Sequence, residues 1–197
     1  MKTCLSFALI ILTASLVWGQ GMADSTFALP EPVADGEMSL EQALSNRQSI
    51  RMYSNEPLSL QQLSQLLWAG QGITRKGFYR TAPSAGALYP LEVYVFAENV
   101  TDLPPGIYHY LPQGHKLERL KEGEYLDSLS NAALGQNAIR ASAASFVITG
   151  VVERTSKKYG DRALQYVLQE TGHAAQNLLL QATALGLGAV PMGAFIE

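Results

Sequence analysis

The chain has 197 residues, of which 47% are hydrophobic and 16% are charged, and its formal net charge is −3. These values fit one globular domain that is long enough to bury a sizeable core. The weak net charge and the lack of like-charge runs argue against a nucleic-acid-binding protein.

The first 20 residues have the pattern of a secretory signal peptide. Lys2 supplies a positive charge, and Leu5 to Trp18 is uncharged and apolar but shorter than the roughly 20 residues that a spanning helix needs. Small residues follow, with cleavage sites at Val17-Trp18-Gly19 or Gly21-Met22-Ala23. We therefore expect an exported chain, periplasmic or secreted, with no stable membrane span after cleavage. An uncleaved segment that anchors the chain in the membrane is the alternative.

The only cysteine, Cys4, lies inside this predicted signal peptide. A processed chain would therefore contain no thiol. Disulfides, thiolate catalysis and cysteine-based metal sites are excluded for such a chain.

Residues 21–37 are predicted to be a linker, and residues 38–197 a folded domain. Ser39 and Ser59 each begin a capping box, which predicts helices that end near Asn46 and at Gly70. The connection from Gln71 to Pro90 is long, without periodicity and rich in glycine, aromatic and basic residues. Connections of this length in a compact domain are usually functional or disordered, and the aromatic content argues against disorder.

The second half of the chain alternates strand and helix patterns. We predict strands at 91–97, 144–152 and 188–192, a hairpin of 107–111 with 116–120, and helices at 123–134 and 161–185. This irregular order indicates an α+β fold rather than a repeated strand–helix–strand unit. The apolar surface of 161–185 is broad, as in a central or dimer-interface helix.

Arg47, Ser49 and Arg51 share one side of a predicted extended segment. Two guanidinium groups beside a hydroxyl could hold a phosphate monoester. Solvated surface arginines are the alternative interpretation.

Two stretches of small residues could allow a ligand to approach the backbone closely. Pro83-Ser84-Ala85-Gly86-Ala87 follows a basic residue, and Pro191-Met192-Gly193-Ala194-Phe195 follows a buried strand. A simple turn and tight packing, respectively, explain the same residues.

Lys158 and Tyr159 lie between the predicted buried strand and the long helix, where they offer two groups for proton transfer; an exposed loop pair is the alternative. Glu170 and His173 have the i, i+3 spacing of some carboxylate-bridged metal sites, but no second such motif accompanies them. We therefore predict no metal site and interpret His173 as a buried, hydrogen-bonded helix residue.

The order of these motifs is more specific than any one of them. The motifs are Arg47 to Tyr53, Pro83 to Pro90, Pro105 to Tyr110, Lys158 to Arg162, Glu170 to Asn177 and Gly186 to Phe195. In this order the chain resembles the nitroreductase superfamily of FMN-dependent oxidoreductases over about residues 38–197. More narrowly it resembles the SagB-type branch, which includes thiazoline/oxazoline dehydrogenases of peptide-modifying pathways.

The resemblance implies an α+β, intertwined homodimer with a central, mostly antiparallel sheet flanked by helices and FMN at the subunit interface. It assigns the FMN phosphate and ribityl chain to Arg47, Gln48, Ser49 and Arg51. It assigns the flavin contacts from the other subunit to Pro83, Ser84, Ala85 and Gly86. It assigns the edge of the ring system to Pro191, Met192, Gly193 and Ala194.

The implied activity is transfer of hydride or electrons between FMN and a small-molecule or peptidic substrate. NAD(P)H would be an electron donor, or the reaction would be azoline dehydrogenation with Lys158 and Tyr159 as catalytic residues. Family members usually continue into a further helix and strand, whereas this sequence stops at Glu197, which suggests a truncated product. The alternative is a non-catalytic, cofactor-free exported binding or scaffold protein that retains the fold.

Overall fold

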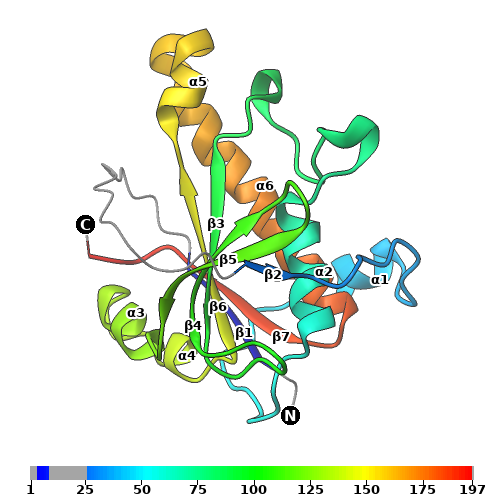
Figure 1. Cartoon of the computed structure of the whole chain (residues 1–197), viewed down its shortest axis with the longest axis vertical. Coiled ribbons are helices and arrows are strands. Elements are labelled where there is room, and N and C mark those ends of the chain that lie inside the picture. The colour runs from blue at the N-terminus through cyan, green and yellow to red at the C-terminus, as the bar shows by residue number, and fades with distance from the viewer. Residues whose placement is uncertain (1–3, 9–25, 197) are drawn as a thin grey trace.

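A computed structural model describes residues 4–8 and 26–196 of the chain (Figure 1). Its strands are β1 (Cys4–Ala8), β2 (Thr26–Ala28), β3 (Leu91–Ala97), β4 (Gly106–Leu111), β5 (Lys116–Glu122), β6 (Ala144–Gly150) and β7 (Gly188–Met192). Its helices are α1 (Leu40–Asn46), α2 (Leu60–Gln71), α3 (Leu126–Ala132), α4 (Asn137–Arg140), α5 (Val152–Tyr159) and α6 (Ala163–Ala184). Short 3₁₀ turns cover Arg75–Gly77, Ala85–Ala87 and Gly160–Arg162.

The strands form one seven-stranded sheet in the order β2-β5-β4-β3-β6-β1-β7. The five strands from β2 to β6 pair antiparallel, and β3 pairs with β6 along its whole length, from Leu91 opposite Gly150 to Ala97 opposite Ala144. β1 pairs in parallel with both β6 and β7. The predicted α+β fold with a mostly antiparallel central sheet is confirmed.

The N-terminal region adds two strands that its sequence did not predict. Within the predicted signal peptide, only Cys4–Ala8 are described, and they form β1; the rest of residues 1–20 lies outside the described residues. In the predicted linker, Thr26–Ala28 form β2 on the edge of the sheet, where the Phe27 ring packs edge-on against Tyr108 at 5.6 Å. A three-residue strand is too short to show a periodic pattern. Within the described ranges, no helix is both long and apolar enough to cross a membrane.

α2 packs closely on α6, and the predicted helix end, Gly70, lies at this contact. Both predicted capping boxes are present, at Ser39 and Ser59. The helix continues one residue past Gly70 to Gln71, and Gly72 is its C-cap. Gly70 lies within the helix and faces Leu178 of α6, since a Cβ there would lie 3.2 Å from the Leu178 side chain. Gly70 therefore serves helix packing rather than helix termination.

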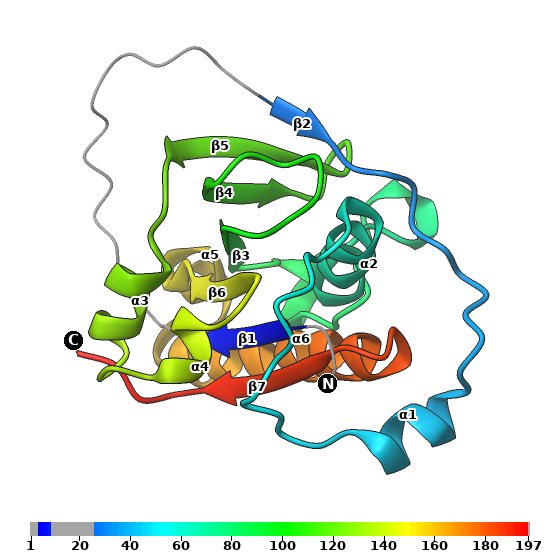
Figure 2. The same ribbon diagram turned by 90° about the horizontal axis from the view of Figure 1, so that it is seen from below.

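α6 is the longest helix, with 22 residues, and it covers one face of the sheet (Figure 2). It begins at Ala163, later than predicted, because a 3₁₀ turn occupies residues 160–162. Val167, Ala174 and Leu178 are fully buried, whereas Leu164 and Leu168 remain 49% and 46% exposed. The helix is thus buried on one side and apolar on part of its free side.

Candidate functional site

The segment from Arg47 to Arg51, called the clamp segment because it is predicted to hold a phosphate, lies along β7. The Ile50 N–H donates to the carbonyl of Ala189 at 2.9 Å, and Ser49 forms a parallel bridge with Ala189. Gly188 permits this approach, since a Cβ there would lie 2.9 Å from the Ile50 side chain. The clamp segment therefore lies beside β7, the strand that ends in Pro191 and Met192.

Arg47 and Gln48 line a cavity of about 380 Å³ between the end of α1 and the end of α6. The Arg47 side chain is half-buried, whereas Ser49 and Arg51 are exposed. The structure thus distinguishes Arg47 from Arg51, which the simple period of two treats alike.

The loop from Pro83 to Tyr89 has a strained backbone that its own side chains hold closed. Gly86, Ala87 and Tyr89 have positive φ angles of 64°, 54° and 46°. The Ser84 hydroxyl accepts the Tyr89 N–H at 2.9 Å, and the Ala87 N–H donates to the Ser84 carbonyl at 3.0 Å. Strained backbone of this kind persists only where the surroundings over-determine it, and it concentrates at functional sites. The sequence did not predict that the Ser84 hydroxyl accepts a hydrogen bond from its own loop.

Lys158 and Tyr159 lie directly against this loop. A Cβ on Gly86 would be 2.9 Å from Lys158 Nζ and 3.0 Å from the Tyr159 hydroxyl. The alternative of an exposed loop pair is wrong, because both residues belong to the last turn of α5. This short, polar helix has too few apolar residues to show a buried stripe, and cations in its last turn suit the helix dipole.

Glu170 joins the same group of residues from α6. The residue is buried, with 4% of its surface exposed, and its carboxylate Oε1 accepts the Ala85 N–H at 2.8 Å. Glu170, Tyr166 and the loop line a cavity of about 230 Å³. His173 lines this cavity too, but it is exposed, so the prediction of a buried His173 is wrong. The helix turns Glu170 and Ala174 inward, and a residue three positions after Glu170 then lies at the edge of the buried face.

Arg154 of α5 braces the far end of the loop. It forms an ion pair with Glu92 of β3 and donates to the Tyr89 carbonyl at 3.2 Å. His109 lies 2.7 Å from the second Glu92 oxygen. Burial alone would raise the pKa of Glu92, but the hydrogen bonds and charges of His109 and Arg154 lower it overall. The Arg80 guanidinium lies over the Tyr89 ring at 4.8 Å. Burial lowers the pKa of Arg80 from its ordinary value.

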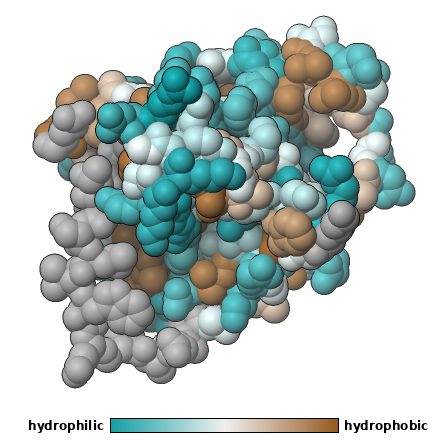
Figure 3. Space-filling view, turned by 90° about the horizontal axis from the view of Figure 1, so that it is seen from above, coloured by the Kyte–Doolittle hydropathy of each residue, from teal (hydrophilic) through white to brown (hydrophobic). Residues whose placement is uncertain are grey.

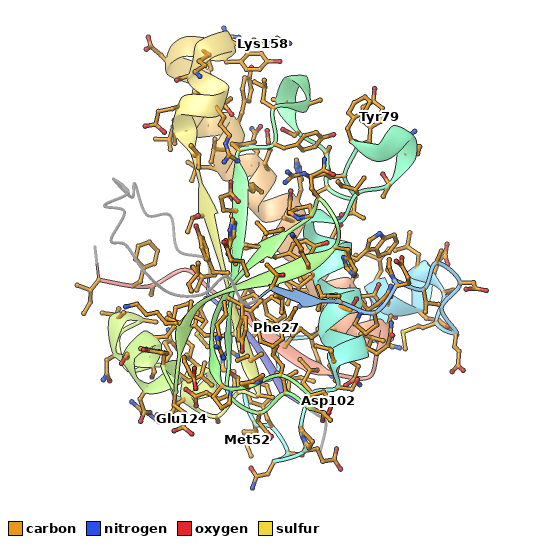
Figure 4. All side chains as sticks on the ribbon, in the orientation of Figure 1. Phe27, Met52, Tyr79, Asp102, Glu124 and Lys158 are labelled. Carbon is orange, nitrogen blue, oxygen red and sulfur yellow. The ribbon has the colours of Figure 1, made fainter. Side chains whose placement is uncertain are left out.

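The predicted site residues thus form two groups within one chain. The first group is the clamp segment with β7, and the second is the Pro83–Gly86 loop with Lys158 and Tyr159. Figure 4 shows Lys158 at one end of the molecule and Met52, which follows Arg51, at the opposite end. Among the described residues, no group of three or more His, Cys, Asp or Glu side chains could hold a metal ion.

The chain belongs to the nitroreductase family of oxidoreductases, whose family model matches residues 44–197. Over 161 residues it is 44% identical to MJ1384 of Methanocaldococcus jannaschii, a protein named as a nitroreductase, and the match covers 82% of this chain and 81% of that protein. A solved structure from Ralstonia eutropha JMP134, titled as a nitroreductase, is 28% identical with a TM-score of 0.71, and covers 91% of this chain and 81% of that one.

A third relative supports the SagB-like branch of the superfamily for this chain. The microcin B17-processing protein McbC of Escherichia coli is 34% identical over 114 residues, which are 55% of this chain and 42% of McbC. The Escherichia coli McbBCD complex, solved with truncated pro-MccB17 bound, matches with 26% identity and a TM-score of 0.58 over 88% of this chain and 65% of that one. The chain therefore spans less than half of McbC in sequence.

FMN is typical of this family, and the described residues fit it. The Arg47 guanidinium and the Gln48 amide, both on one cavity, supply hydrogen-bond donors suited to a phosphate monoester. After β7, a Cβ on Gly193 would have no atom within 4 Å, so the backbone there is open to a flat ring.

Proposed function

We propose that this protein is an FMN-dependent oxidoreductase that transfers hydride or electrons to or from a small-molecule or peptidic substrate. The observation that carries this proposal is the contact of Lys158 and Tyr159 with Gly86. The ammonium of Lys158 and the hydroxyl of Tyr159 both lie against this strained loop, which supports a proton-transfer role for them.

Arg47, Gln48, Ser49 and Arg51 would hold the phosphate and ribityl chain, and Pro191 to Ala194 would line the edge of the ring. When bound, FMN would supply the redox chemistry. Lys158 and Tyr159 would hold or move the proton that accompanies hydride transfer. NAD(P)H is the proposed electron donor for reductive turnover.

We propose a homodimer in which the loop of one chain completes the clamp of the other. The separation of the two groups in one chain supports this assembly, because neither group alone surrounds a ligand. Two pairs of exposed leucines also support the dimer. In each pair the leucines are four positions apart and so share a helix face: Leu40 and Leu44 on α1, and Leu164 and Leu168 on α6. Seen from the end of the molecule that carries α5, apolar side chains reach the surface in several groups between hydrophilic ones (Figure 3).

The proposed substrate class includes azoline rings in peptides, because the relatives include a microcin-processing protein whose complex was solved with a precursor peptide. Oxidation of an azoline removes a hydride and a proton from the ring. Lys158 or Tyr159 would accept the proton. The predicted signal peptide extends the proposal to an exported enzyme that acquires FMN outside the cytoplasm.

Reconstitution with FMN tests the proposal. The purified chain is incubated with excess FMN and desalted, and the absorbance of retained flavin is measured. We expect a yellow protein. A chain that stays colourless would refute the proposal and favour a cofactor-free binding protein.

Variants then separate the proposed roles. Arg47→Ala with Arg51→Ala should lower FMN retention, whereas Lys158→Ala should retain FMN and lose turnover. Unchanged retention in the arginine variant would show that these side chains are solvated surface charges. Loss of both flavin and turnover in Lys158→Ala would assign Lys158 a structural role.

A further inference from the structure

Glu170 places a buried carboxylate against the Pro83–Gly86 loop. Its contact with the Ala85 N–H joins residues that are 85 positions apart in the sequence. The polar end of a glutamate that is only 4% exposed is costly to bury without hydrogen-bond donors, so this contact stabilises both partners. The loop is therefore attached to the middle of α6 at a defined backbone atom.

The strained loop requires an anchor of this kind. The bond from the Tyr89 N–H to Ser84 closes the loop on itself but does not fix its position relative to the helices. Two contacts do: Glu170 holds Ala85 from α6, and Arg154 holds the Tyr89 carbonyl from α5. Because Ala85 directly precedes Gly86, Glu170 acts on the part of the loop that meets the Lys158–Tyr159 pair.

The same face of α6 also positions Tyr159. The Tyr159 ring packs edge-on against Tyr166, with ring centroids 4.9 Å apart. Tyr166 lies four residues before Glu170 on α6, so the two side chains are neighbours on one helix face. One turn of α6 thus contacts the loop through Glu170 and the proton-transfer pair through Tyr166.

We propose that Glu170 is a positioning residue that sets the gap between Gly86 and the Lys158–Tyr159 pair by accepting the Ala85 N–H. The anchoring role stands on the geometry of this chain, and its consequence for catalysis rests on the proposed function. The carboxylate is assigned no proton transfer, since the group it touches is a backbone amide.

Hydrogen exchange of the full-length chain without added FMN tests the anchor. We expect Glu170→Ala to speed amide exchange in residues 82–89 by roughly tenfold or more, because the hydrogen bond that holds the Ala85 N–H is lost. Glu170→Gln retains an oxygen that can accept the Ala85 N–H, so it should restore most of the protection. Glu153→Gln, which neutralises an exposed glutamate on α5, is the matched control and should leave the loop unchanged.

Residues 144–150 of β6 provide the internal reference. Unchanged exchange of the loop in Glu170→Ala would overturn the proposal. Equal acceleration in residues 82–89 and in β6 would also overturn it, since Glu170 would then support the fold as a whole.

Turnover of the FMN-loaded enzyme tests the consequence for catalysis. Misplacement of reacting groups lowers kcat more than it raises KM, so Glu170→Ala should lose on the order of 10- to 100-fold in kcat with KM little changed. Glu170→Gln should stay close to wild type. A fast-exchanging loop with wild-type kcat would refute the positioning role. If the wild-type chain binds no FMN, the proposed function fails, whereas hydrogen exchange still decides whether Glu170 anchors the loop.

Discussion

Gly86 allows the Pro83–Gly86 loop to contact the Lys158–Tyr159 pair. Its φ of +64° favours glycine, and its missing Cβ leaves room for Lys158 Nζ and the Tyr159 hydroxyl. We expect Gly86→Ala to cost about 1 kcal/mol of unfolding free energy for the backbone strain. It should also lower turnover, because the ends of both side chains must move. Urea unfolding and steady-state kinetics measure the two effects.

Gly77→Ala is the matched control for this substitution. Gly77 has a φ of +71°, but a Cβ there would have no atom within 4 Å. We expect a similar loss of stability with unchanged turnover. Equal turnover in the two variants would show that the contact of Gly86 with the Lys158–Tyr159 pair has no role in the reaction.

His115 makes stability depend on pH. Its ring nitrogens lie 2.7 Å from the Ser64 hydroxyl and 2.8 Å from the Tyr110 hydroxyl. Burial lowers the pKa of His115 below its ordinary value of 6.5, although the Pro30 carbonyl opposes this shift. The unfolded chain therefore binds the proton more readily, so the contribution of neutral His115 is complete above 6.5 and is lost as pH falls below that value.

The urea concentration at the midpoint of unfolding should therefore decrease when the pH is lowered from about 7.5 to about 5.5. Variants identify the group responsible. His115→Asn should reduce this dependence, while His173→Asn, which changes an exposed histidine, should retain it. An identical pH dependence in all three proteins would rule out His115 as its source.

At the scale of elements, strong local patterns predicted structure well, and short or polar elements escaped prediction. The strands at 91–97 and 188–192 have the predicted bounds, because alternation or continuous apolar residues between turn signals mark them. α5 was not predicted, because only Thr155 of its eight residues is buried. Its place is decided instead by Arg154 at its start and Tyr159 at its end.

Gly150, the last residue of β6, determines how closely α6 approaches the sheet. A Cβ there would lie 2.3 Å from Val167 Cγ1, a contact that cannot exist without movement of a buried β-branched side chain. We expect Gly150→Ala to destabilise the fold by roughly 1–3 kcal/mol through overpacking. Thermal or urea unfolding measures this loss. Gly36→Ala, where a Cβ meets no atom within 4 Å, should stay close to wild type.

At the scale of the whole molecule, the proposed homodimer can be tested by measuring the assembly state and the retention of FMN. A Leu164→Asp, Leu168→Asp double variant places charges on the exposed apolar face of α6. If this face forms the dimer interface, the variant should be monomeric and should lose most FMN retention, because the loop and the clamp no longer meet. Sedimentation velocity and flavin absorbance measure the two outcomes.

Leu120→Asp is the control for the dimer test. Leu120 is 45% exposed on β5, away from α6, and its substitution should leave assembly unchanged. A double variant that still dimerises and retains FMN would move the interface elsewhere.

Removal of residues 1–20, as signal cleavage would produce, also acts on the whole molecule. β1 lies between β6 and β7, and β7 pairs with no other strand among the described residues. We expect the shortened chain to unfold at lower urea concentration and to exchange the amides of 188–192 faster than the full chain. Equal stability of the two chains would show that β1 contributes little to holding β7.

The sequence by itself determined the fold class, most strands and helices, and the family, because these depend on periodicity, capping boxes and motif order within short stretches. The proposed FMN-binding segments also come from the sequence. Only the tertiary structure decided that Ser84 closes its own loop, that Glu170 rather than His173 is buried, and that Lys158 and Tyr159 end a helix against Gly86. These contacts join positions up to 85 residues apart, and no local pattern encodes a partner at that separation. The packing of α5 and α6 on the sheet brings such partners together.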